Sequence, residues 1–385
     1  MHMNMRGSLV VAFTLTFTSA LLSSTAAAEN AADNAVNAAN APLDAVMNAA
    51  AASGFSGVVL VGDETRVLYE KSLGLADRAT GTPNSAALPW RWASVSKQVT
   101  AAIAAQLIDE GKLALDRSVA DYLSAAQFPA KNARAITIRH LLQHTSGLPN
   151  PSAEDSPTNP IPLFYRRKVA AASIHSEPTR GFCAGLGKGA PGAAFEYNNC
   201  DYLVLGAVIE QLTGRRFAEV LAARISQPLK LASVKFVSEN NAPEVVKGYE
   251  DTSQPEPAVN LATYGASGAL MGTPRDLLAL DRALLGEGLL SRKSKEQFWA
   301  GNPKLGYVAL GVWSFPASLK GCKGAVELIE RRGAISGIQV RNIIAPKLSR
   351  ALVVFTNRGD WEFGEIWQGK GFSYELLSAA LCGAS

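Results

Sequence analysis

The sequence predicts a mixed α/β (α+β) protein, in which an antiparallel sheet takes strands from both chain ends and a mainly helical lobe is inserted between them. The β-rich runs 57–61 and 66–69 flank the turn-like residues 62–64 and predict a hairpin. Strand character returns at 337–340 and 351–355, whereas most of the intervening chain has helical periodicity. A chain of 385 residues, 48% hydrophobic and 18% charged, can bury the core that such a fold needs.

The longest expected helix begins at Ser94. Its residues Val99, Ile103 and Leu107 form one apolar stripe, and Gly111 is a plausible stop. The other expected helices are residues 43–52, 201–212, 275–285 and 374–381. The folded domain is therefore expected to span residues 43–385, with a sheet lobe at about 43–95 and 300–385 and a helical lobe at about 96–299.

The N-terminus predicts export. A basic start ending at Arg6 leads into the apolar residues 8–22 and then into three alanines at 26–28, so residues 1–28 are expected to be a cleaved signal peptide. A membrane anchor is the alternative, but this stretch contains hydroxyl residues and is shorter than the roughly 20 apolar residues that span a bilayer. Residues 29–42 are expected to form a flexible Ala/Asn-rich leader. The mature protein would be periplasmic or secreted, without a stable membrane span.

Export also changes how the four cysteines are interpreted, because an oxidising compartment favours disulfides. Of the three possible pairings we expect Cys183 with Cys200 and Cys322 with Cys382. Four unpaired thiols remain the alternative.

The charge pattern argues against nucleic acid as a partner. The net charge of +4 comes from 37 basic and 33 acidic residues, and no basic run is longer than the triplet at 166–168. Partners are therefore sought among small molecules and peptides.

The sharpest chemical feature is the run Ser94-Val95-Ser96-Lys97 at the start of the long helix. Residues three apart share a helix face, so the Ser94 hydroxyl and the Lys97 amine would lie side by side. A serine hydroxyl becomes a good nucleophile only with a base beside it, and a partly buried lysine can be that base. Taken alone, this four-residue pattern is weak, and Ser94 as an ordinary helix cap would be the preferred interpretation.

Two further motifs favour a catalytic reading. Residues 197–199 (YNN) form a Tyr-x-Asn pattern, and residues 331–334 (RRGA) place a cation and a glycine just before an expected strand. In this order the three motifs resemble the serine β-lactamase and penicillin-binding protein superfamily. The resemblance is greatest to the class C β-lactamase-related branch, which includes D-alanyl carboxypeptidases, D-aminopeptidases and short-chain esterases. The supporting stretches are residues 90–98, 136–148 and 202–214.

The resemblance implies a division of labour. Ser94 would attack a carbonyl carbon and form an acyl-enzyme, with Lys97 as its base. Tyr197 would act as a phenolate or proton shuttle, protonating the leaving group and later activating water, provided that nearby cations lower its pKa. No metal or organic cofactor is implied, because these three residues together supply nucleophile, base and acid.

The resemblance also implies substrate-binding groups. Asn199 would orient the lysine and bind a substrate carbonyl. The backbone N–H groups of Ser94 and of Ala334, which follows Gly333, would stabilise the oxyanion. Relatives usually carry Lys or His where this chain has Arg331, and an arginine cannot pass protons. Arg331 is therefore expected to hold a substrate carboxylate, or alternatively to pair with Glu330 or another nearby acid.

The expected activity is acyl transfer to Ser94 from a β-lactam or a D-alanyl-peptide-like substrate. A short-chain carboxylesterase and a non-catalytic penicillin- or peptidoglycan-binding receptor are the alternatives.

The pair His140 and His144 has the spacing of a zinc-binding helix, but no glutamate follows His140, so both are interpreted as structural. The loops at 149–162 and 181–192, rich in proline and glycine respectively, are expected to border the cleft.

Overall fold

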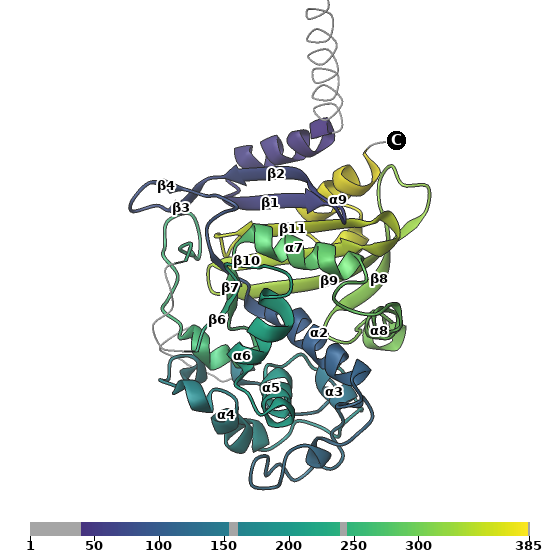
Figure 1. The fold of residues 1–385 in the computed structure, drawn as a ribbon. Helices are drawn as coiled ribbons and strands as arrows, with labels where there is room; N and C mark the ends of the chain where they lie inside the picture. The colour runs from purple at the N-terminus through teal and green to yellow at the C-terminus, as the bar shows by residue number, and fades with distance from the viewer. Residues whose placement is uncertain (1–39, 154–160, 239–244, 384–385) are drawn as a thin grey trace, which may run out of the picture.

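A sheet lobe and a helical lobe make up the part of the chain that the structure describes (Figure 1). The computed structural model describes residues 40–153, 161–238 and 245–383, so the expected signal peptide lies outside the described residues. Residues 40–52 are helical, which confirms the short helix expected there and shows that the last residues of the expected leader are part of it.

The main sheet has six strands in the order β2-β1-β11-β10-β9-β8. Every neighbouring pair is antiparallel, and strand β1 pairs with β11 near the opposite end of the chain. The strands are β1 (Gly57–Gly62), β2 (Val67–Leu73), β8 (Trp313–Ser318), β9 (Ala325–Ile335), β10 (Ile338–Ala345) and β11 (Arg350–Thr356). The predicted fold class is therefore confirmed.

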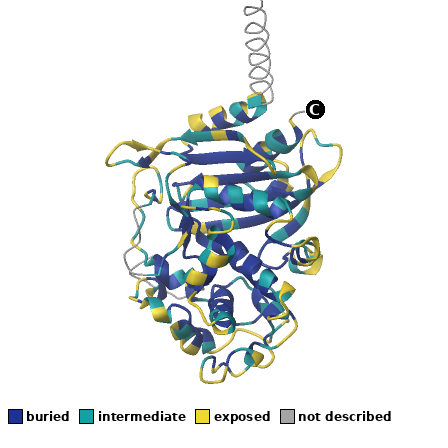
Figure 2. Cartoon of the chain, viewed as in Figure 1, coloured by how far each residue is buried: buried dark blue, intermediate teal, exposed yellow. Residues whose placement is uncertain are grey.

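Two apolar clusters sandwich this sheet. On one face, helix 40–52 and the C-terminal helix α9 (Phe372–Cys382) pack over Val59 and Val354. On the other face, the side chains of Val58 and Val353 join the large core shared with the helical lobe. Figure 2 shows buried residues running through the central strands and down into the helices below. Because β-strand side chains alternate between faces, both faces of β1 and β11 are buried, which explains their continuous apolar runs.

The inserted lobe is built around two 14-residue helices, α2 (Ser96–Asp109) and α5 (Cys200–Thr213). Helix α7 (Pro274–Leu285) instead packs against strands β1 and β11 of the sheet. The remaining helices are α3 (Ile138–Leu142), α4 (Ser176–Arg180), α6 (Phe217–Leu221) and α8 (Arg292–Phe298). The predicted helices at 94–107, 201–212, 275–285 and 374–381 all occur, with their ends shifted by a few residues.

Two small sheets were not anticipated from the sequence. Strands β5 (Trp90–Arg91), β7 (Leu270–Gly272) and β6 (Lys235–Phe236) form one of them, in that order. Strands β3 (Leu75–Asp77) and β4 (Thr82–Pro83) form the other. Strands of two or three residues are too short to show a period of two in the sequence, so only tertiary pairing reveals them.

Both expected disulfides are present. Cys183 is bonded to Cys200 at the start of α5, and Cys322 is bonded to Cys382 at the end of α9. Disulfides are typical of oxidising compartments outside the cytoplasm. Within the described residues, no helix has both the length and the apolar character that crossing a membrane requires.

Candidate active site

Ser94 lies where a strained turn joins the long helix α2. The 3-10 helix Ala93–Val95 leads directly into α2, and the buried Ala93 has a φ of +48°. A non-glycine residue in the left-handed region is costly and persists only where its surroundings enforce it, often at functional sites. The turn leaves Ser94 partly exposed beside two cavities, whereas its neighbours Ala93 and Val95 are fully buried.

Lys97 lies one turn along the same helix and is completely buried. Its Nζ atom is 3.1 Å from Ser94 Oγ and donates to Asn199 Oδ1 at 2.6 Å and to the carbonyl of Ser267 at 2.8 Å. Burial lowers the pKa of Lys97 to about 8, with a further contribution from the charge of Arg331. An amine with this pKa can give up its proton near neutral pH and accept one from Ser94.

Tyr197 reaches the same hydroxyl from the segment that precedes α5. Its phenol oxygen is 2.7 Å from Ser94 Oγ and accepts a hydrogen bond from Arg331 Nη2 at 2.9 Å. Burial alone would raise the pKa of Tyr197, but the charges of Lys97 and Arg331 outweigh it and lower the pKa to about 8. The structure thus brings the Tyr197 phenol, 103 residues away in the sequence, to the hydroxyl that the Lys97 amine also contacts.

Asn199 is in the position to orient Lys97, because its Oδ1 accepts from the lysine. Its Nδ2 donates to Tyr165 at 2.7 Å and to Ser152 at 3.2 Å. Both amide protons are therefore engaged within the protein, so the geometry does not support the expected contact of Asn199 with a substrate carbonyl.

Strand β9 runs directly beside Ser94. A side chain at Gly333 would come within 2.7 Å of the Trp92 carbonyl and 3.2 Å of the Ser94 nitrogen, so only glycine allows this approach. The next residue, Ala334, is exposed and lines both cavities next to Ser94. This places the strand where its backbone N–H at Ala334 could meet an oxyanion formed at Ser94.

Arg331 lies elsewhere than its expected role requires. Its side chain is 1% exposed and lines neither of the two cavities beside Ser94. Its Nε donates to the Ser94 carbonyl at 2.9 Å, and its Nη2 donates to Tyr197. The expected clamp on a substrate carboxylate is therefore corrected: Arg331 binds the Ser94 backbone carbonyl and the Tyr197 hydroxyl. The alternative pairing with Glu330 is made by Arg332.

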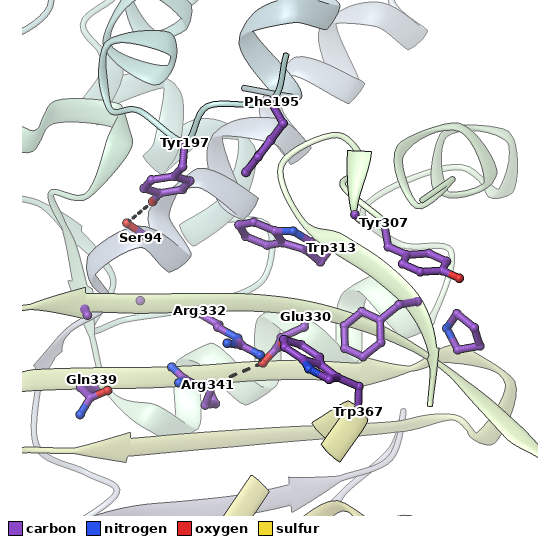
Figure 3. Close-up of a pocket in the computed structure, with 15 residues that line it drawn as sticks. Ser94, Phe195, Tyr197, Tyr307, Trp313, Glu330, Arg332, Gln339, Arg341 and Trp367 are labelled. Carbon is purple, nitrogen blue, oxygen red and sulfur yellow. Dashed lines mark hydrogen bonds and ion pairs between the residues drawn. The ribbon is translucent and has the colours of Figure 1, made fainter. Parts of the chain in front are cut away.

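Two cavities flank Ser94, and Tyr197 and Ala334 line both of them. The larger has a volume of about 730 Å³ and is walled mainly by aromatic side chains (Figure 3). Its aromatic residues are Phe195, Tyr197, Tyr307, Trp313, Phe315 and Trp367. The smaller has a volume of about 330 Å³ and is lined by Ser152, Tyr165, Asn199 and Tyr264, among others. A substrate bound at Ser94 could thus place its two halves on opposite sides of the hydroxyl.

Charged residues at the far wall of the larger cavity were missed by sequence reasoning. Arg332 pairs with Glu330 at 2.9 Å and with Glu365 at 2.7 Å. Arg341, on strand β10, lies 3.9 Å from Glu330, and its Nε has no hydrogen-bond partner among the described residues (Figure 3). The RRGA motif marked this region, but nothing in the sequence showed that Arg341 shares a cavity with Ser94.

Comparison with known proteins agrees with this geometry. The Beta-lactamase family model matches residues 43–367. Esterase EstB from Burkholderia gladioli is 33% identical over 210 residues, which are 52% of this chain and 51% of the esterase. Penicillin-binding protein 4 from Amycolatopsis lactamdurans is 31% identical over 231 residues, 58% of this chain and 57% of that protein. These two alignments thus span little more than half of each relative.

Solved structures share the fold at lower identity. The D-amino acid amidase from Ochrobactrum anthropi SV3 superposes with a TM-score of 0.72 at 22% identity, covering 90% of this chain and 99% of the amidase. A D-stereospecific amidohydrolase from Streptomyces sp. gives a TM-score of 0.69 at 24% identity, with coverage of 90% and 99%. The family model matches most of this chain, and the two solved structures share its fold over 90% of its length. This chain therefore belongs to the Beta-lactamase family.

Proposed function

We propose that the protein is an exported serine hydrolase that transfers an acyl group to Ser94 and then to water. The observation that carries the proposal is the three-way contact at Ser94, with Lys97 Nζ at 3.1 Å and the Tyr197 oxygen at 2.7 Å. Both partners have a pKa of about 8, so the pair can release one proton under mildly alkaline conditions and serve as a base. The two disulfides support an oxidising, periplasmic or secreted location.

The reaction follows from these groups. The Lys97 and Tyr197 pair takes the proton of Ser94 as its oxygen attacks the carbonyl carbon, and the N–H groups of Ser94 and Ala334 stabilise the oxyanion. When the bond to the leaving group breaks, Tyr197 donates the proton to the leaving atom. Water then attacks the acyl-enzyme, again with Tyr197 as base, and Ser94 is released with its proton restored.

The two cavities favour a substrate whose halves differ in character. We place an apolar or aromatic half in the larger cavity, because Trp313, Phe315 and Trp367 offer it flat apolar walls. The smaller cavity is lined by more polar groups, including Ser152, Ser336 and Glu250. Esters and amides with an aromatic half fit this division.

We retain the expected preference for a substrate carboxylate but assign it to Arg341 in the larger cavity. Arg341 has a side chain only 13% exposed, and its Nε lacks a hydrogen-bond partner within the described chain. A carboxylate in the larger cavity would give Arg341 Nε a direct hydrogen-bond acceptor in addition to Glu330, which lies 3.9 Å away. D-alanyl peptides and β-lactams both carry such a group, and they remain the first candidates beside neutral short-chain esters.

A panel of three substrates tests the proposal. Purified mature protein and a Ser94→Ala variant are incubated with a reporter β-lactam, a D-alanyl-D-alanine peptide and a 4-nitrophenyl butyrate ester, while product and intact mass are followed. Fast product without a lasting adduct identifies a β-lactamase or an esterase by the substrate consumed, and a slowly hydrolysed adduct on Ser94 identifies a peptidase-like enzyme. A permanent adduct indicates a receptor. Neither product nor adduct, or equal turnover by Ser94→Ala, would refute the proposal.

A further inference from the structure

The segment that carries Tyr197 lies between residues 184 and 200, where the structure has no helix or strand. Something other than secondary structure must therefore hold the phenol within 2.7 Å of Ser94 Oγ. One residue that contacts this segment is His144, from the loop that follows helix α3. Its carbonyl accepts the Glu196 N–H at 2.8 Å, and its ring lies 4.5 Å from the Tyr197 ring, centroid to centroid.

His144 is itself held in an unusual conformation. It is 2% exposed and has a φ of +56°, a region that a residue with a bulky side chain seldom occupies. A hydrogen bond of 3.0 Å joins its Nδ1 to Asp201 Oδ2, and its Nε2 has no hydrogen-bond partner in the described part of the chain. The bond to Asp201 therefore fixes the orientation of the ring.

Asp201 connects both sides of this contact. It lies in the first turn of α5, is completely buried, and also accepts hydrogen bonds from Ser146 Oγ and, at 3.0 Å, from Asn198 Nδ2. Asn198 directly follows Tyr197, and Ser146 lies two residues after His144 in the sequence. One carboxyl group thus ties the His144 loop to Asn198, the residue that follows Tyr197.

The His144 and Asp201 pair orients the segment that carries Tyr197 but brings no net charge to it. Burial lowers the pKa of His144 well below its usual value and raises the pKa of Asp201 well above its usual value. The charged groups that act on the Tyr197 phenol are instead Lys97 on α2 and Arg331 on β9, while Trp313 from β8 adds an uncharged ring. A small displacement of the phenol would weaken its contacts with both cations.

We propose that His144 and Asp201 are a positioning pair, which holds Tyr197 against Ser94 and between Lys97 and Arg331. This inference rests on the proposed function, since it assigns the pair a role through Tyr197. It predicts that loss of the pair lowers kcat more than it changes KM. It also predicts that the pKa of Tyr197 returns toward its ordinary value, because the phenol moves away from the two cations.

Two variants of His144 separate the ring from the hydrogen bond. His144→Phe keeps an aromatic ring but removes the bond to Asp201, whereas His144→Asn keeps a polar group near the position of Nδ1. We expect His144→Phe to lower kcat about 100-fold. The apparent pKa of the acidic limb of the kcat/KM profile should also rise by about one pH unit. His144→Asn should recover part of both effects. The matched control is His140→Asn, whose ring instead caps the start of α3 through Thr137.

A second route removes the partner. Asp201→Asn should produce the same shift in pH profile, and the double variant with His144→Phe should be no worse than either single variant, because both remove one interaction. Thermal unfolding and the rate at which a fluorophosphonate labels Ser94 accompany each measurement. If His144→Phe is too unstable to purify, Asp201→Asn alone decides by the same readouts.

The inference is overturned if folded His144→Phe or Asp201→Asn keeps kcat within about twofold of the parent with an unmoved pH profile. A loss of kcat with an unmoved profile would also overturn it, because that pattern marks general destabilisation. Failure of the proposed function has a different signature, namely a Ser94→Ala variant that still turns over.

Discussion

Two neighbouring arginines on strand β9 have opposite surroundings. Arg331 points to the helical lobe, is 1% exposed, and donates to the Ser94 carbonyl and the Tyr197 phenol. Arg332 points to the other face, has a side chain 28% exposed, and is paired with two glutamates at the wall of the larger cavity. Because side chains alternate along a strand, one residue type serves two purposes one position apart. We infer that the Arg331 face supports the chemistry and that the Arg332 face builds the cavity.

The largest expected effect separates these faces directly. Arg331→Met should lower kcat about 10²- to 10³-fold, because it removes a charged donor 2.9 Å from the Tyr197 oxygen. Arg332→Met, the matched control on the other face, should lower kcat less than about tenfold. Steady-state rates on a 4-nitrophenyl ester measure both. Equal losses in the two variants would show that the distinction between the faces is wrong.

The next effect concerns stability on the Arg332 face. Glu330 has a side chain 3% exposed and pairs with Arg332, so Glu330→Gln would leave cations without their buried partner. We expect the free energy of unfolding to fall by about 3 kcal/mol. Glu365→Gln, at a position 35% exposed, should cost about 1 kcal/mol or less. Denaturation in urea compares them, and a smaller loss at Glu330 than at Glu365 would contradict the assignment.

The pH profile sharpens the role of Arg331. With the pKa of Tyr197 at about 8, kcat/KM should rise through about pH 8 as the pair formed by the Tyr197 phenol and the Lys97 ammonium loses a proton. Removing a cation disfavours the phenolate and raises that pKa. In Arg331→Met, the pH at which kcat/KM reaches half of its plateau should therefore increase by about one pH unit. The profile of Arg332→Met should coincide with that of the parent. A downward shift in Arg331→Met would reverse the sign of the argument.

The smallest expected effect tests the cavity wall. Arg341→Met removes the cation whose Nε lacks a hydrogen-bond partner among the described residues. We expect the preference for a 4-nitrophenyl ester bearing a carboxylate over its neutral analogue, as a ratio of kcat/KM, to fall about fivefold. The neutral ester is the internal control. An unchanged ratio would remove Arg341 from substrate recognition.

Much of the fold could be predicted because its elements have strong local patterns. The runs at 57–61 and 351–355 are apolar without interruption because both faces of their strands are buried, and Gly111 and Gly214 mark helix ends with positive φ. Residues 331–334 were expected just before a strand but lie within the long strand β9, which combines buried charges with apolar residues and so lacks a clean alternation. The two small sheets were not predicted for a different reason, namely that their strands are only two or three residues long.

The residue types of the candidate site could be predicted, but the groups that each side chain faces could not. Ser94 and Lys97 share one helix turn, so their contact follows from the spacing alone. Arg331 was expected to face the substrate and instead faces Tyr197, and His144 was interpreted as structural although it lies against the Tyr197 ring. Neither direction is encoded locally, because each depends on which surface of a strand or loop meets another lobe.

By itself, the sequence indicated the main strands at both chain ends, the longer helices and the three motifs, because each depends on local periodicity or spacing. The cysteine pairs were an expectation that the structure confirms. Only the tertiary structure decided which arginine reaches the Tyr197 phenol, which one lines the larger cavity, and that Asp201 anchors His144. Those facts arise where segments more than fifty residues apart come together in a water-poor interior. Burial and charge act there on groups whose neighbours the linear order does not reveal.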